Sequence, residues 1–132
     1  MKKFGCRNHP LRSMNENDLF LLRLHFLIIV VKAALQGYPV GKYRKKASLK
    51  NAGEISKMIS GMDLSFLGME TSQHLFKERV RLLAIMVSAI IGENYPLGVH
   101  RREAVLDNIE IIERCAFPRS RLVLFDKVLK VA

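Results

Sequence analysis

Residues 19–35 read LFLLRLHFLIIVVKAAL, and this apolar run decides the fold class. Apolar side chains would lie on nearly every side of a helix formed by it, which is typical of a helix buried on most of its circumference. Asn15 can cap such a helix, and Gly37 followed by Pro39 is a stop signal. The sequence therefore predicts a central helix over residues 16–36.

The same run raises the question of a membrane span, and its charged residues argue against one. Arg23 and Lys32 lie inside it, and a charge near a bilayer centre costs about 2.5–3.5 kcal/mol. The charge-free part is far shorter than the roughly 20 residues needed to span a bilayer. Glu16 and Asp18 precede the run, in a leader far too long for the n-region of an ordinary signal peptide. We therefore expect no integral membrane insertion, and we interpret residues 1–14 as a flexible basic N-terminal extension.

Four further segments show the periodicity of helices, and they are residues 49–60, 71–91, 100–116 and 119–131. The last also has the composition of a strand, but an isolated strand would lack partners, so a helix is the better prediction. Residues 15–132 are thus predicted to form a single all-α domain, a compact bundle of about five helices. The second half of the 71–91 segment, LLAIMVSAII, is apolar on all sides and predicts a second central helix. A homodimer would bury part of this surplus apolar surface.

The chain carries a formal net charge of +10 over 132 residues, and this charge is distributed unevenly. Residues 1–50 hold eleven Lys and Arg against two acidic residues, a balance of +9, whereas residues 51–132 are nearly neutral at +1. Such an asymmetry steers a protein toward nucleic acid, an anionic membrane surface or an acidic protein, although many basic faces serve solubility alone. The two cysteines are too few for a disulfide framework, which favours a reducing, cytoplasmic location.

The densest basic stretch is GKYRKKASLK, residues 41–50, which contains no acid. We predict a loop up to Ala47, with Ser48 as the N-cap of the helix that follows. The Lys and Arg side chains can neutralise phosphates, and Tyr43, or Tyr38 just before the stretch, can stack on a base. The candidate contact residues are Lys42, Tyr43, Arg44, Lys45, Lys46 and Lys50.

A second candidate patch lies near the C-terminus, at Arg119 and Arg121. The turn AFP, residues 116–118, joins two predicted helices closely enough for a helix-turn-helix. In that motif the early residues of the second helix reach base edges. The turn lacks the common glycine, however, and the apolar residues that follow are equally suited to packing in the bundle.

The sequence contains no recognisable motif for catalysis or for a cofactor. Cys6 and His9 have the spacing of half a zinc site, but a structural site needs four ligands and the other cysteine is Cys115. The acidic residues of segment 100–116 repeat every three or four positions, a pattern more typical of a solvated face, with its arginines available as counter-ions. No glycine-rich phosphate loop is present. We therefore expect no enzyme activity, no metal and no cofactor.

A basic N-terminal half without a catalytic motif indicates a protein that acts by binding. We predict a small cytoplasmic regulatory protein that contacts nucleic acid through the basic loop, without catalysis. The alternative is a helical protein–protein interaction module, such as an adaptor, a secretion-type chaperone or an anti-regulator, which would bind an acidic or helical partner. The methionines of the predicted helices suit either an adaptable surface or an ordinary core.

Overall fold

A computed structural model describes residues 15–69 and 72–118 of the chain. Its long elements are four helices: α2 (Glu16–Leu35), α3 (Lys42–Gly61), α4 (Gln73–Val87) and α5 (Val99–Ala116). A 3₁₀ turn, η2 (Ser65–Leu67), precedes α4, and a π-helical turn, η3 (Ser88–Gly92), extends it. All regular structure in the described ranges is helical, so the predicted all-α class is confirmed.

Two of the predicted segments are not part of this description. The fifth helix, predicted over residues 119–131, lies outside the described residues. The N-terminal extension predicted over residues 1–14 lies outside them as well. Both remain predictions from the sequence.

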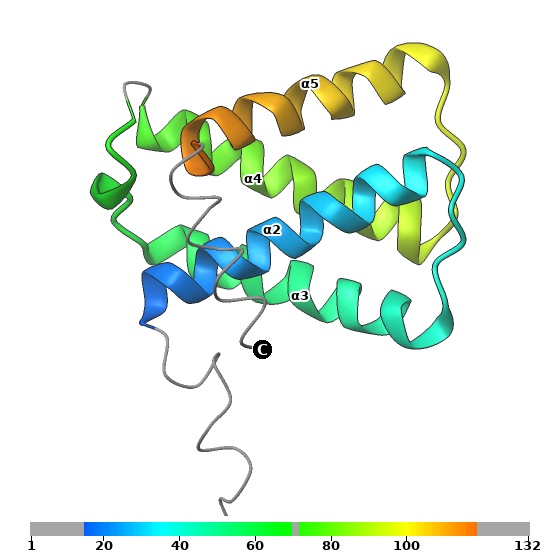
Figure 1. The fold of residues 1–132 in the computed structure, drawn as a ribbon, viewed down its shortest axis with the longest axis horizontal. Helices are drawn as coiled ribbons and strands as arrows, with labels where there is room; N and C mark the ends of the chain where they lie inside the picture. The colour runs from blue at the N-terminus through cyan, green and yellow to red at the C-terminus, as the bar shows by residue number, and fades with distance from the viewer. Residues whose placement is uncertain (1–14, 70–71, 119–132) are drawn as a thin grey trace, which may run out of the picture.

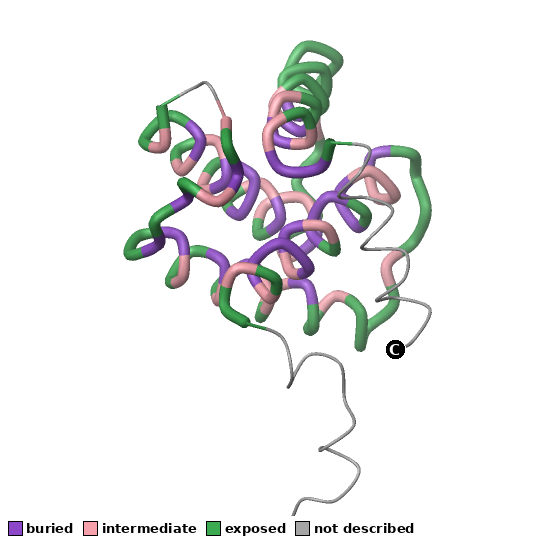
Figure 2. The backbone as a smooth tube through the Cα atoms, turned by 60° about the vertical axis from the view of Figure 1, so that its left-hand side comes forward, coloured by how far each residue is buried: buried purple, intermediate pink, exposed green. Residues whose placement is uncertain are grey.

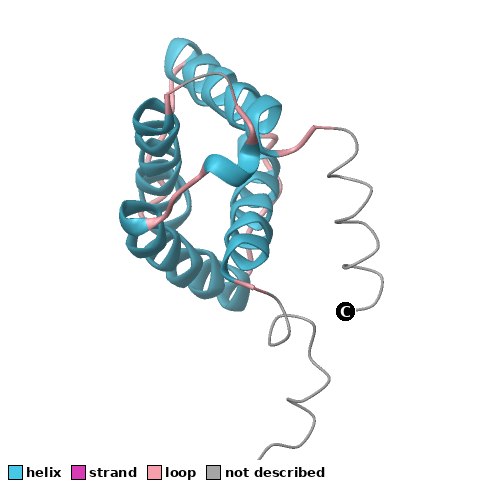
Figure 3. Ribbon diagram, turned by 90° about the vertical axis from the view of Figure 1, so that its left-hand side faces the viewer, coloured by secondary structure: helices cyan, strands magenta, loops and turns pink. Residues whose placement is uncertain are grey.

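The four helices form an up-and-down bundle in which each helix runs antiparallel to the one before it (Figure 1). Helix α2 packs against α3, α4 and α5, and the most extensive contact joins α3 to α4. Seen from another side, the helices enclose the core from four directions (Figure 3). Helices α3 and α5 therefore begin at one end of the bundle, and α2 and α4 begin at the other.

The core consists of buried apolar residues that all four helices contribute. The buried positions are purple on the backbone in Figure 2. Phe20 and Leu24 of α2, Ile55 of α3, Phe76 of α4 and Ile109 of α5 are each at most 1% exposed. Burial of apolar surface contributes roughly 25 cal/mol per Å², so this shared core is what holds the helices side by side.

Two arginine–asparagine pairs clamp neighbouring helices together. Arg23 Nη1 of α2 donates to Asn51 Oδ1 of α3 at 2.9 Å, and Asn51 Nδ2 donates to the carbonyl oxygen of Arg23 at 2.8 Å. Arg79 of α4 and Asn108 of α5 repeat the arrangement at 3.1 and 3.0 Å. In both pairs the guanidinium is bonded to an amide rather than to a carboxylate.

Helix α2 forms where the apolar run predicts it and ends one residue earlier than expected. Gly37 follows with φ +91°, a left-handed conformation that favours glycine, and this confirms the predicted stop. The helix is not buried on every side, because Phe26 and Ile29 are 43% and 48% exposed. Within the described ranges, no helix combines the length and the apolar character needed to cross a membrane.

The helix starts at the two ends of the bundle are capped differently. Asn15 and Ser72 each accept a hydrogen bond from a backbone N–H at the starts of α2 and α4, which confirms the predicted Asn15 cap. Helices α3 and α5 begin instead after Gly41 and Gly98, which provide no side-chain cap. One end of the bundle thus has satisfied helix starts, and the other has two starts without a side-chain cap.

The basic stretch 41–50 is helical, so the predicted loop is wrong. Helix α3 begins at Lys42 rather than at residue 49, after Gly41 in an extended conformation. Ser48 does not cap a helix but lies buried in the interior of α3. Lys, Arg, Ala and Leu are good helix formers, so the helix starts as soon as the linker provides an N-cap.

The apolar segment LLAIMVSAII is not buried on all sides, which corrects the prediction of a second central helix. Leu82 and Ile85 of α4 are 53% and 61% exposed, and Leu75 on the same outward face is 58% exposed. Each helix of a four-helix bundle meets its neighbours over only part of its circumference. A segment that is apolar all round must therefore leave some apolar side chains in solvent.

Candidate nucleic-acid interface

Helix α3 begins with a run of bases and no acid. Lys42, Arg44 and Lys45 follow directly on the Gly41 cap, and the first turn contains no acidic side chain. Positive side chains there oppose the positive end of the helix dipole, where an acid would stabilise by about 0.3–1 kcal/mol. This start therefore suits an external anion better than it suits the stability of the isolated helix.

Helix α5 begins in the same way at the same end of the bundle (Figure 1). Arg101 and Arg102 are its third and fourth residues, as Arg44 and Lys45 are of α3. The two starts read GKYRK and GVHRR, each with its N-cap glycine first. We define the basic end of the bundle as Lys42, Arg44, Lys45, Arg101 and Arg102.

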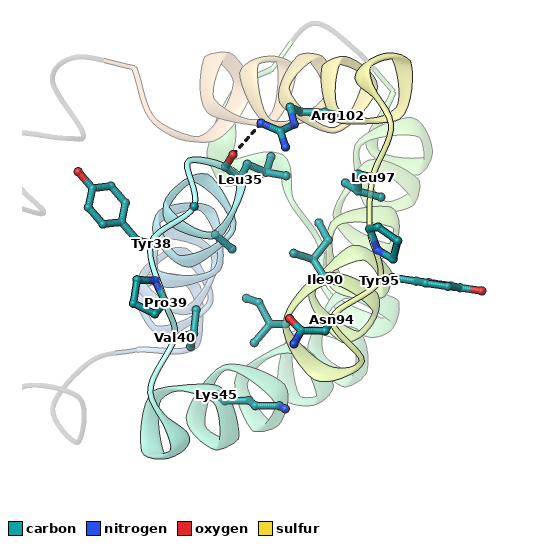
Figure 4. A pocket seen from close by; sticks show the side chains of 14 residues that line it. Leu35, Tyr38, Pro39, Val40, Lys45, Ile90, Asn94, Tyr95, Leu97 and Arg102 are labelled. Carbon is teal, nitrogen blue, oxygen red and sulfur yellow. Dashed lines mark hydrogen bonds between the residues drawn. The ribbon is translucent and has the colours of Figure 1, made fainter.

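A pocket of about 470 Å³ lies between the two helix starts (Figure 4). Lys45 borders it from α3 and Arg102 from α5, with Asn94 of the linker before α5 also in its wall. Arg102 Nη1 donates to the carbonyl oxygen of Leu35 at 2.9 Å, which satisfies the end of α2 and fixes the guanidinium beside the pocket. The remaining wall is largely apolar, and no acidic residue lines the pocket.

The charges of the basic end are not neutralised within the described ranges. None of its five side chains forms an ion pair there. The ion pairs observed lie elsewhere, as in the bond of 3.0 Å from Lys32 of α2 to Glu113 of α5. At the opposite end, Glu16 and Asp18 occupy the first turn of α2, where they suit the positive end of the helix dipole.

At the opposite end, the carboxylate of Asp63 accepts three hydrogen bonds from its neighbours. Its Oδ1 accepts from the Ser65 hydroxyl at 2.7 Å, from the Ser65 backbone N–H at 3.1 Å and from Gln73 Nε2 at 3.1 Å. These bonds, the one from the Ser65 hydroxyl above all, lower the pKa of Asp63, and Lys77 adds a smaller attraction. Negative charge is thus satisfied locally at this end, whereas positive charge is open to a partner at the other.

The structure separates the predicted contact residues of α3 onto different faces. Exposed side chains belong to Lys42, Tyr43, Arg44, Lys46 and Lys50. Lys45 is half-buried and borders the pocket. Lys42, Lys46 and Lys50 recur every four residues and so share the outer face of α3, whereas Arg44 and Lys45 lie on its two flanks. The helix therefore presents a row of lysines that runs away from the basic end.

The second predicted patch cannot be placed on this surface. Arg119 and Arg121, with the second helix of the predicted helix-turn-helix, lie outside the described residues. The Cys6 and His9 pair lies outside them as well. Among the residues that are described, no three His, Cys, Asp or Glu side chains gather in a way that could hold a metal ion.

Arg101 and Arg102 are not among the contact residues that the sequence pattern predicts. They precede the acidic face of their own helix, so they look like its counter-ions. In the structure, Arg102 instead donates a hydrogen bond to the last residue of α2, and both arginines lie at the basic end. The signal that could find them is the repeated spacing of a glycine followed by bases at the third and fourth helical positions.

The described residues define an all-α bundle of four long helices with one basic end. Comparison with protein-family models, with curated proteins and with solved structures finds no match to this chain.

Proposed function

We propose that this protein binds nucleic acid through the basic end of its bundle and acts by binding, without catalysis. The observation that carries the proposal is the convergence of bases from two helices on one end, where none of them forms an ion pair within the described ranges. Unpaired Lys and Arg side chains release counterions from a phosphate backbone, which is a main source of affinity for nucleic acid. Tyr43 is 86% exposed at the start of α3 and adds a ring on which an unpaired base can stack.

The lysine row of α3 extends this interface. Lys42, Lys46 and Lys50 are spaced by about 6 Å along the helix axis, so the row covers about 12 Å. A DNA duplex carries about seven phosphate charges over that length, enough for every lysine of the row. Contacts of this kind position a protein on the backbone, so we expect little preference for base sequence.

Titration of binding with salt, on mixed-sequence duplex DNA and RNA, tests the proposal. Binding through these bases predicts that log affinity falls linearly with log salt, by about 0.9 per phosphate contact on duplex DNA. A protein that ignores both polymers at low salt would refute the proposal. A stoichiometric protein that co-purifies with the chain would support the interaction-module alternative instead.

Two finer predictions accompany this function. We place the protein in the cytoplasm as a regulator, because its two cysteines suit a reducing compartment. We also keep the homodimer as a prediction, since Leu75, Leu82 and Ile85 form an exposed apolar face on α4 that a second copy could cover. Gel filtration coupled to light scattering measures the mass directly, and the mass of a monomer would exclude the dimer.

A further inference from the structure

A groove of about 640 Å³ lies between α2 and the first half of α3. It shares only the linker residues 38–40 with the pocket at the basic end. Phe26, Ile29, Val30 and Ala33 of α2 give it an apolar floor, on which Phe26 and Ile29 are 43% and 48% exposed. Its volume falls within the range of about 300–1,000 Å³ that is usual for binding clefts. An apolar floor of this kind is not needed for contacts with a phosphate backbone, so it indicates a second type of partner.

The rim of the groove is basic. Arg23, Arg44 and Lys50 line it, and no acidic residue does. Arg23 is bonded to Asn51, which follows Arg44 by seven residues on α3. Because a helix rises 1.5 Å per residue, the Arg23 and Arg44 positions are separated by about 10 Å along the groove. The floor therefore has one cation toward each end.

Arg23 is one of these cations, and its bond to α3 holds it in place. Its side chain is partly buried, its Nη1 is bonded to the Asn51 amide, and its buried Nε has no hydrogen-bond partner. No carboxylate in the described ranges forms an ion pair with it. Because Arg23 is only partly buried and has no counter-charge there, a carboxylate brought by a partner would stabilise it.

We propose that this groove binds an acidic amphipathic helix of a partner protein. The apolar side chains on one face of that helix, three or four residues apart, pack on Phe26 and Ile29 in the helix-in-groove mode. Two carboxylates about seven residues apart on the same helix lie about 10 Å from each other and meet Arg23 and Arg44. An anion with a single charged head would leave one of these two cations without a partner.

The charge of the groove also makes segments of this chain poorer occupants than an acidic partner helix. Residues 119–132 are apolar enough to lie in a groove, but they carry four bases against one acid and share the charge of the rim. In a second copy, Glu103 and Glu110 of α5 have the required spacing. However, Glu110 is already paired with Arg114, and Leu106 is the apolar side chain between them at only 39% exposure.

The test uses a synthetic stapled helix of about 15 residues as the probe, with three leucines on one face and two glutamates seven residues apart. A second peptide has glutamine in place of both glutamates. Binding of each labelled peptide to the full-length protein is measured by fluorescence anisotropy without nucleic acid. We expect saturable binding of the acidic peptide, and binding about two- to fivefold weaker for the neutral peptide or for the variant Arg44→Gln.

The variant Phe26→Gln/Ile29→Gln removes the apolar floor and is expected to weaken peptide binding at least about tenfold. Its matched control is Leu82→Gln/Ile85→Gln on α4, which changes two similarly exposed apolar residues that do not line the groove. Thermal melting verifies that each variant folds. Should the groove variant not fold, Arg44→Gln and the neutral peptide still test the proposal.

Four results would overturn the proposal. The first is peptide binding that does not saturate by about 1 mM peptide. The second is an equal loss of peptide affinity in the groove variant and in the control variant. The third is self-association of the wild type that only the groove variant abolishes, which would assign the groove to a second copy. The fourth is tighter peptide binding by Leu122→Gln/Phe125→Gln, which would assign it to the chain's own C-terminal segment. The groove variant should leave salt-dependent binding to duplex DNA unchanged, so this proposal and the nucleic-acid proposal can fail separately.

Discussion

Three exposed bases from two helices provide the sharpest test of the nucleic-acid interface. Replacing Lys42, Arg44 and Arg101 by glutamine removes up to three phosphate contacts at the basic end. Each contact contributes about 0.9 to the slope of log affinity against log salt, so the slope on duplex DNA should become shallower by about 2.7. At 0.1 M salt the same three contacts correspond to an affinity loss of about 500-fold. Stability should not fall, because bases in a first helical turn oppose the helix dipole.

The measurement is fluorescence anisotropy of a labelled duplex at several salt concentrations between about 50 and 200 mM, with thermal melting as the check on folding. The control replaces Lys57, Lys77 and Arg114 by glutamine, which removes the same formal charge from the opposite end of the bundle, together with the ion pair from Arg114 to Glu110. If both triple variants flatten the slope equally, net charge rather than the basic end governs binding. A slope near zero for the wild type would refute phosphate contacts altogether.

Three further predictions concern stability. Leu24→Ala should lower the free energy of unfolding in urea by about 2–5 kcal/mol, because Leu24 is fully buried, and a loss below about 1 kcal/mol would contradict the packing. Gly37→Ala should cost about 1–2 kcal/mol in the same assay because of its φ of +91°, whereas Gly61→Ala, in equally open space without a positive φ, should not destabilise. The pKa of Asp63 is lower in the folded state than in the unfolded state, so its charged form stabilises the fold above the unfolded-state pKa. This contribution is lost as the pH falls through the folded-state pKa. Asp63→Asn should therefore reduce the drop in melting temperature below about pH 4, and parallel curves for variant and wild type would contradict the role of its hydrogen bonds.

Helix α2 can be predicted almost to the residue because its signals are local. The cap at Asn15 and the left-handed glycine at Gly37 depend on chemistry within one helical turn of each helix end. The apolar run between them is long enough to exclude a short strand. None of these signals requires knowledge of the neighbouring helices.

The start of α3 is harder to predict because two local signals compete. Gly41 looks like part of the linker that begins with Gly37 and Pro39, and Ser48 has the side chain of an N-cap. The bases between Gly41 and Ser48 have good intrinsic helix propensity, however, and their charge says nothing against a helix. In the structure this propensity prevails, and the supposed loop forms the first turns of α3.

The basic end itself depends on tertiary arrangement. Arg44 and Arg101 are 57 residues apart in the sequence. They reach the same end because two antiparallel connections, from α3 to α4 and from α4 to α5, bring the starts of α3 and α5 together (Figure 1). Periodicity predicts each helix but not the order in which helices surround the core, so α5 could not be linked to α3 from the pattern alone. The same limit explains the exposed Leu82 and Ile85, whose burial depends on which neighbours α4 has.

Gly41 and Gly98 leave the first backbone amides of α3 and α5 without a side-chain acceptor at the basic end. Helix starts that lack a side-chain cap and carry like charges fray at low cost, and their amide hydrogens should exchange early. A polyanion that binds there binds the folded state and not the unfolded state. At a concentration of 100 times its dissociation constant, such a ligand adds about 2.7 kcal/mol to the free energy of unfolding. The protein with nucleic acid bound should therefore resist proteolysis and heat better than the unbound protein, with the greatest slowing of exchange in the first turns of α3 and α5.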